Sequence, residues 1–157
     1  MSKRLSFAIL TLALANSGAA DEELDAAFAK DVLIIEASQY ACHRFDIYLA
    51  KDDIQRSRGL MFVRELPQTT GMLFVYDRSQ RVSMWMRNTY IPLDMVFARR
   101  DGTVSSIAQH TEPMSLRSVI SIEAVDFVLE LNAGTAERLF IDEDSRLWWE
   151  PANDNDE

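Results

Sequence analysis

The residues best suited to chemistry are two carboxylates in otherwise apolar segments. Asp94 interrupts the run LDMVF, and Glu130 interrupts the run VLEL. A carboxylate with such neighbours must be paired with a cation, hydrogen-bonded, or solvated by a cleft. Arg58, beside Gly59 at the end of a predicted helix, is a candidate partner for Asp94, because arginine binds a carboxylate through two parallel hydrogen bonds.

These observations lead to the hypothesis that Arg58, Asn88, Asp94 and Glu130 converge on one partly polar cleft. Asn132, two residues after Glu130, lies on the same face of the same predicted strand. The full set of predicted ligand-binding residues is Arg58, Met72, Trp85, Met86, Asn88, Thr89, Asp94, Glu130 and Asn132. The alternative is a structural clasp that ties helix to sheet, since ion-pair networks that only hold a fold are common. Strand alternation could also point Glu130 to solvent.

The cleft hypothesis predicts a binding or accessory module for an unknown small molecule or protein. An alternative is a hydrolase that acts on saccharides through Asp94 and Glu130 as paired carboxylates. No nucleophile elbow, phosphate-binding glycine loop, Cys-x-x-Cys or His-Glu-x-x-His motif is present, so no cofactor is expected. His43 and His110 lack the paired spacing of a structural zinc site.

A second alternative is a Cu(I)-handling protein, because thioethers bind Cu(I) and five methionines fall close together. They are Met61, Met72, Met84, Met86 and Met95. The competing interpretation is adaptable filling of the core, for which methionine is well suited.

Short strands with tight connections must position these side chains. Segments with period-two alternation or apolar runs predict strands at 32–36, 43–50, 72–76, 81–86, 93–99, 103–109, 125–131 and 147–149. Short helices are predicted after Asp52, which forms a capping-box pattern with Gln55, and at 135–140. Residues 21–30 are polar and helix-prone and predict a frayed first turn. The fold class is therefore mainly β (α+β), a curled antiparallel sheet forming a small barrel or sandwich with two short helices.

The first twenty residues have the pattern of a secretory signal peptide. Lys3 and Arg4 precede eleven uncharged, mostly apolar residues, and small residues end at Ala20. Cleavage there predicts a periplasmic or secreted domain at 21–150 with an acidic flexible tail at 151–157; an uncleaved anchor is the alternative.

Removal of residues 1–20 changes the net charge from −9 to −11. This charge predicts repulsion from nucleic acid and from anionic membrane surfaces. No integral membrane segment is expected in the mature chain. The lone Cys42 excludes an internal disulfide. At the start of a predicted strand it is expected to be buried, and a disulfide between two chains is the alternative.

Several short motifs, in order along the chain, resemble those of exported proteins of the family called domain of unknown function 192. The matching segments are Arg58–Phe62 (RGLMF), Gly71–Phe74 (GMLF), Trp85–Thr89 (WMRNT), Ile91–Met95 (IPLDM) and Leu129–Gly134 (LELNAG). Arg87 stands where the family usually has lysine. The resemblance covers residues 32–148 and implies a β-rich single domain, often exported, with no established activity.

Overall fold

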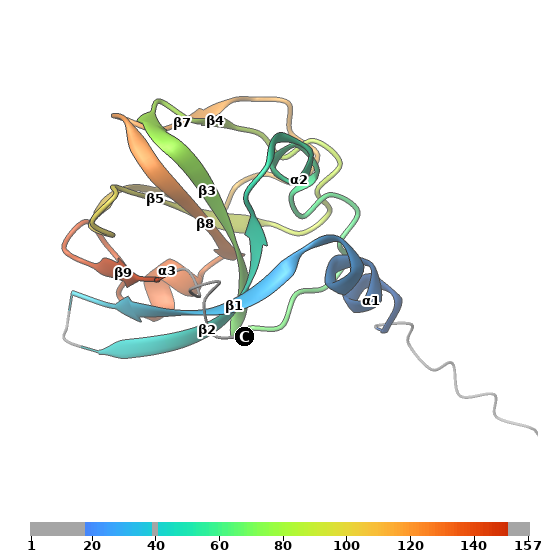
Figure 1. Ribbon diagram of the computed structural model, residues 1–157, viewed down its shortest axis with the longest axis horizontal. Helices are drawn as coiled ribbons and strands as arrows, with labels where there is room; N and C mark the ends of the chain where they lie inside the picture. The colour runs from blue at the N-terminus through green and yellow to red at the C-terminus, as the bar shows by residue number, and fades with distance from the viewer. Residues whose placement is uncertain (1–17, 39–40, 151–157) are drawn as a thin grey trace, which may run out of the picture.

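One curled sheet dominates the computed structural model, which describes residues 18–38 and 41–150 (Figure 1). Its strands follow the order β6-β5-β8-β3-β2-β1-β9. They are β1 (Ala29–Glu36), β2 (Cys42–Ala50), β3 (Thr70–Gln80), β5 (Leu93–Ala98), β6 (Val104–Ala108), β8 (Val125–Asn132) and β9 (Arg146–Trp148). A second, two-stranded sheet pairs β4 (Ser83–Met84) with β7 (Val119–Ile120). The predicted acidic tail and all but the last three residues of the predicted signal peptide lie outside the described residues.

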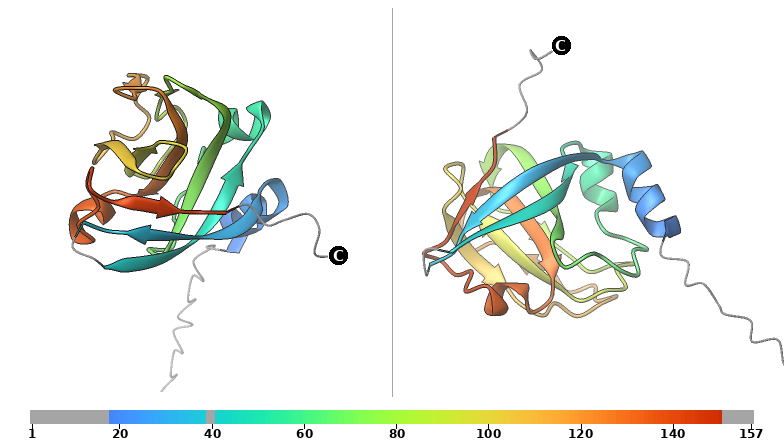
Figure 2. Two further views of the ribbon diagram at one scale, coloured as in Figure 1. Left: turned by 60° about the vertical axis from the view of Figure 1, so that its left-hand side comes forward. Right: turned by 90° about the horizontal axis from the view of Figure 1, so that it is seen from below.

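The two edges of the main sheet meet, so that it forms a nearly closed barrel (Figure 2). A bridge joins Thr103, just before β6, to Arg146 of β9. Backbone hydrogen bonds from Val104 N to Ser145 O (3.1 Å) and from Leu147 N to Gly102 O (2.8 Å) reinforce the junction. The predicted mainly β fold class is confirmed, with two differences. β2 and β3 run parallel, because the chain crosses over through α2 between them, and the described residues form three short helices where two were predicted.

Strand alternation gives the barrel two cores, one on each side of its wall. The inner core takes residues from all seven strands, including Leu33, Leu73 and Leu131. The outer core lies against β2, β3, β5 and β8 and is covered by α1, the segment 59–66 and β4. All residues of β5 are buried because this strand contacts both cores.

The helices are α1 (Gly18–Ala27), α2 (Asp53–Arg58) and α3 (Thr135–Arg138). The predicted capping box of α2 is present: the Asp52 side chain accepts from Gln55 N at 2.8 Å, and the Gln55 side chain accepts from the Asp52 backbone. Gly59 ends α2 with a φ of +48°, a conformation that favours glycine.

The first helix differs from the prediction of a frayed turn at 21–30. Leu24 and Phe28 are buried in the outer core, and the Tyr48 hydroxyl donates to Asp25 at 2.8 Å. Apolar side chains four residues apart share one helix face, which explains the docking. α1 therefore covers the outer core beside α2 (Figure 2).

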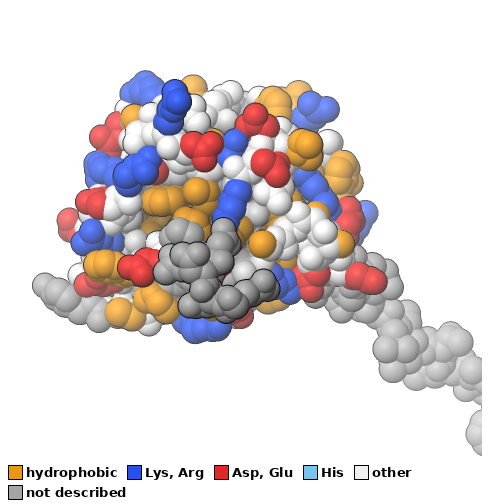
Figure 3. Space-filling model, viewed as in Figure 1, with side chains coloured by type: hydrophobic (Ala, Val, Ile, Leu, Met, Phe, Trp, Pro, Cys, Tyr) orange, Lys and Arg blue, Asp and Glu red, His pale blue; other side chains and the backbone are white. Residues whose placement is uncertain are grey.

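The surface carries charges of both signs. Acidic and basic side chains are interspersed over the face shown in Figure 3. Cys42 is exposed at the start of β2, contrary to the expected burial, because it precedes the alternating part of the strand that reaches the core.

Candidate functional site

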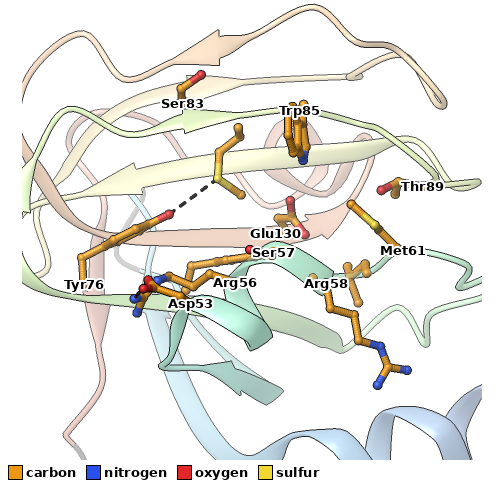
Figure 4. A pocket seen from close by; sticks show the side chains of 14 residues that line it. Asp53, Arg56, Ser57, Arg58, Met61, Tyr76, Ser83, Trp85, Thr89 and Glu130 are labelled. Atoms are coloured by element: carbon orange, nitrogen blue, oxygen red, sulfur yellow. Dashed lines mark hydrogen bonds and ion pairs between the residues drawn. The ribbon is translucent and has the colours of Figure 1, made fainter.

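A cleft of about 270 Å³ opens in the outer layer, between the barrel wall and the segments that cover the outer core (Figure 4). Helix α2 and the turn after it form one side, β3 and β8 form the base, and β4 with Trp85 forms the other side. The lining residues are Asp53, Arg56, Ser57, Arg58, Gly59, Leu60, Met61, Phe74, Tyr76, Ser83, Met84, Trp85, Thr89 and Glu130.

Glu130 lies at the base of this cleft. It faces the outer core because its neighbours across the sheet, Met72 and Met95, also belong to that core. The side chain is 4% exposed, and its carboxyl lies between α2 and Trp85 (Figure 4). Among the described residues, no hydrogen bond holds this carboxyl. Burial therefore raises the pKa of Glu130 to about 8, so that it is mostly protonated at neutral pH.

Tyr76 and Arg56 form one end of the cleft. The Tyr76 hydroxyl donates to the Met84 thioether at 3.8 Å, and burial raises the pKa of Tyr76 to about 12. The Arg56 guanidinium lies 5.2 Å from the centre of the Tyr76 ring. It also donates to Val75 O at 2.8 Å and to Asp53 at 2.6 Å, which hold it at the side of the cleft.

Arg58 lines the cleft only with its stem. Its guanidinium turns away toward α1 (Figure 4) and forms an ion pair with Glu23 at 2.7 Å. It also lies 5.4 Å from the centre of the Phe28 ring. The expected pairing of Arg58 with Asp94 is therefore wrong, because a helix that was not predicted supplies the partner.

Asp94 lies on the opposite face of the sheet from Glu130. It pairs in register with Leu131, whose side chain belongs to the inner core. Its two carboxylate oxygens accept hydrogen bonds from His110 N and Ala136 N, each at 2.9 Å. Asp94 thereby caps the first turn of α3, which Gly134 cannot do because it has no side chain.

The structure therefore does not form the cleft predicted from four converging side chains. Asp94 is a clasp, as the alternative interpretation held, but it ties α3 and the segment after β6 to β5. The predicted hydrolase arrangement needs both carboxyl groups in one open cleft. Asp94 and Glu130 do not provide it, because they face opposite sides of the barrel wall.

The other predicted residues separate into those that line the cleft and those that support it. Trp85, 49% exposed, and the buried Thr89 line it with Glu130 and the stem of Arg58. Met72 and Met86 lie in the outer core behind it. The remaining two predicted residues, Asn88 and Asn132, form hydrogen bonds to backbone groups of the segment that covers the outer core. Asn88 adopts a positive φ of 56° and accepts from Phe62 N, whereas Asn132 donates to Leu66 O at 2.8 Å.

The five clustered methionines are not gathered into one site. Met72, Met86 and Met95 are at most 1% exposed within the outer core. Met61 and Met84 line the cleft, and each accepts a hydrogen bond, from Asn88 and Tyr76 respectively. The residues support the interpretation of adaptable core filling for most of the cluster.

Sequence reasoning missed several lining residues, chiefly Arg56, Ser57, Tyr76 and Ser83. Tyr76 carried a readable signal, since it ends the apolar run GMLFVY and therefore shares a face with Phe74. The serines carried no such signal, because they occupy ordinary polar positions.

Residues 18–38 and 41–150 contain no group of three or more His, Cys, Asp or Glu side chains arranged to hold a metal ion. They also contain no helix that is long and apolar enough to cross a membrane.

Comparisons with solved structures identify related folds. A Sinorhizobium meliloti protein described as a "putative transcription regulator" shares 40% identity with a TM-score of 0.76, covering 77% of this chain and 94% of that one. A protein of unknown function from Novosphingobium aromaticivorans shares 32% identity with a TM-score of 0.74, covering 76% and 85%. No curated protein matches. The model of the DUF192 family, described as "Uncharacterized ACR", matches residues 33–149, and the chain therefore belongs to this family of unknown function.

Proposed function

We propose that this protein is a small-molecule-binding domain that acts outside the cytoplasm, and that the cleft around Glu130 is its binding site. The first twenty residues support export, because they have the charge, length and small-residue ending of a signal peptide. The volume of about 270 Å³ suits a small ligand.

The Glu130 carboxyl is the observation that carries this proposal. A largely buried carboxyl without a hydrogen-bond partner in the protein is poorly solvated, and a ligand that bonds to it would recover part of the free energy that this costs. Asp94 offers the contrast within the same sheet, since two backbone N–H groups satisfy it. Glu130 has no comparable partner among the described residues, and its side chain lines the cleft.

The family motifs support the same location. Four of them contribute lining residues although they are far apart in the sequence. The contributions are Arg58, Gly59, Leu60 and Met61 from the first, Phe74 from the second, Trp85 and Thr89 from the third, and Glu130 from the last. If these motifs served only to stabilise the fold, they would have no need to border one open space.

Thermal denaturation in the presence of candidate ligands tests the proposal. The purified protein is screened against sugars, amines, small anions and metal ions including Cu(I), and each hit is repeated with E130Q. A ligand at about one hundred times its Kd should stabilise the native state by about 2.7 kcal/mol, which raises Tm.

The matched control is Glu65→Gln, which removes an exposed carboxylate outside the cleft. The control variant should respond like the wild type, whereas E130Q should lose the response. Hits that stabilise all three proteins equally would place binding elsewhere and refute the proposed site.

A further inference from the structure

We infer, on the basis of the proposed binding site, that its ligand is a small organic cation with a protonated amine beside an apolar body. The amine would bond to the Glu130 carboxylate at the base of the cleft, and the apolar body would contact the surrounding aromatic rings. This assignment follows from the charges, the surfaces and the size of the cleft.

The charges around Glu130 leave its carboxylate without a counter-ion. The titratable and charged groups that border it from α2 and β3 are Asp53, Arg56, Arg58 and Tyr76. Arg56 is held by Asp53 and Val75 O, and Arg58 is held by Glu23 outside the cleft.

Neither arginine acts as a stabilising partner of Glu130, whose pKa is set by burial. The neighbours on β5 and on the facing part of β3 are Met95 and Met72, which carry no charge. A positively charged group on the ligand would therefore supply the missing partner for this carboxylate.

The lining surfaces also suit a cation. Phe74, Tyr76 and Trp85 surround the base, and aromatic faces attract positive charge. The Met61 and Met84 thioethers provide further polarisable, uncharged surface. A ligand of many hydroxyl groups would find few free hydrogen-bond partners here. The Arg56 guanidinium is held by Asp53 and Val75 O, and the Thr89 hydroxyl donates to Arg87 O at 3.4 Å.

The size restricts the ligand to a compact molecule. The volume of about 270 Å³ lies just below the range of about 300 to 1,000 Å³ that is usual for small-molecule pockets. Phenethylamine, with one ring and one amine, is a probe of suitable size, and 2-phenylethanol differs from it only in the charged group.

Binding of an amine should release a proton from the site. A cation pairs with the ionised carboxylate, whereas Glu130 is mostly protonated below pH 8, where burial places its pKa. The affinity for the amine should therefore rise about tenfold per pH unit up to about pH 8 and then level off. The alcohol should show no such pH dependence.

Isothermal titration calorimetry of the full chain with the two probes tests this inference at pH 6, 7, 8 and 9. We expect phenethylamine to bind about tenfold more tightly than 2-phenylethanol at pH 9, where the site is largely ionised. Measurements in two buffers of different ionisation enthalpy should report close to one proton released per amine bound at pH 6. E130Q should bind both probes equally, and Glu65→Gln should keep the wild-type preference.

Equal affinity for the two probes at pH 9, amine binding that does not change between pH 6 and pH 8, or no amine binding would each overturn the inference. The buffer comparison uses the wild-type protein, so it decides the question even if E130Q does not fold. If neutral or anionic molecules raise Tm in a Glu130-dependent manner while amines do not, the ligand class is wrong and the proposed site stands. If no ligand class raises Tm in a Glu130-dependent manner, the proposed function fails as well.

Discussion

Replacement of Glu130 by glutamine should change how the stability of this protein depends on pH. Glutamine has nearly the same shape as glutamate but cannot ionise. The wild-type side chain is buried at the base of the cleft, and its charged form is disfavoured there. The two proteins should therefore differ little in stability in acid and increasingly as pH rises.

The size of the effect follows from proton binding in the two states. The Glu130 carboxyl has a pKa of 4.5 in the unfolded chain and about 8 in the folded protein. Below pH 4.5 both states hold the proton, so folding carries no ionisation penalty. Between pH 4.5 and 8 the unfolded state alone releases it, which lowers the free energy of unfolding by about 1.4 kcal/mol per pH unit. Above pH 8 both states are ionised, and a total loss of roughly 4 to 5 kcal/mol remains.

Urea denaturation at intervals from pH 4 to 9 measures this difference. The free energy of unfolding of E130Q minus that of the wild type should rise by roughly 4 to 5 kcal/mol across the range, mostly between pH 5 and 8. Glu65→Gln removes a negative charge at an exposed position and corrects for the change in net charge. A difference that stays flat or falls with pH would show that the carboxyl is solvated or paired in solution, and the reasoning about the cleft would be refuted.

Three further substitutions test the supporting structure by urea denaturation. Asp94→Asn should lower the free energy of unfolding by about 2 to 4 kcal/mol, because one of the two backbone donors to Asp94 would then face an amide N–H. The exposed control Asp77→Asn should leave it nearly unchanged. Equal effects of the two substitutions would contradict the clasp. Leu24→Ala should cost about 2 to 5 kcal/mol by leaving a cavity under α1, and a change below 1 kcal/mol would mean that this helix is not docked. Gly71→Ala should lower the free energy of unfolding by about 1 to 3 kcal/mol, because the new Cβ would lie 2.8 Å from the backbone oxygen of Glu130 in β8. Unchanged stability would show that β3 and β8 can separate.

The barrel was predictable from the sequence where one periodic pattern dominated. The expected strands at 43–50 and 125–131 match β2 and β8 within one residue at either end. The strand expected at 81–86 shrinks to Ser83–Met84, because the residues on either side are irregular; Val82 and Met86 among them pack into the outer core. α1 was missed because polar residues outnumber the two apolar side chains, Leu24 and Phe28, that dock it.

The site was only partly predictable, because the sequence does not reveal how two strands align. Asp94 and Glu130 have similar neighbours, and each was assigned correctly to a buried strand. The register pairs Asp94 with Leu131 and Met95 with Glu130, which puts the two carboxyl groups on opposite faces. A shift of one residue would have put them together, and period-two patterns do not distinguish these alignments.

The two carboxylates show how the same local sequence pattern can place one carboxyl among backbone donors and the other at the base of a cleft. Both lie in apolar strands, so each carries a cost of desolvation. For Asp94 the chain itself offsets that cost, because two backbone N–H groups point at its oxygens and connect three elements. For Glu130 the described chain supplies no donor, while nearby arginines are held by other partners. If position 130 served only stability, an apolar side chain would be favoured, since it would fill the outer core without the free-energy cost of desolvating a carboxyl. The presence of a carboxyl at the base of an open cleft therefore favours recognition of a ligand over support of the fold.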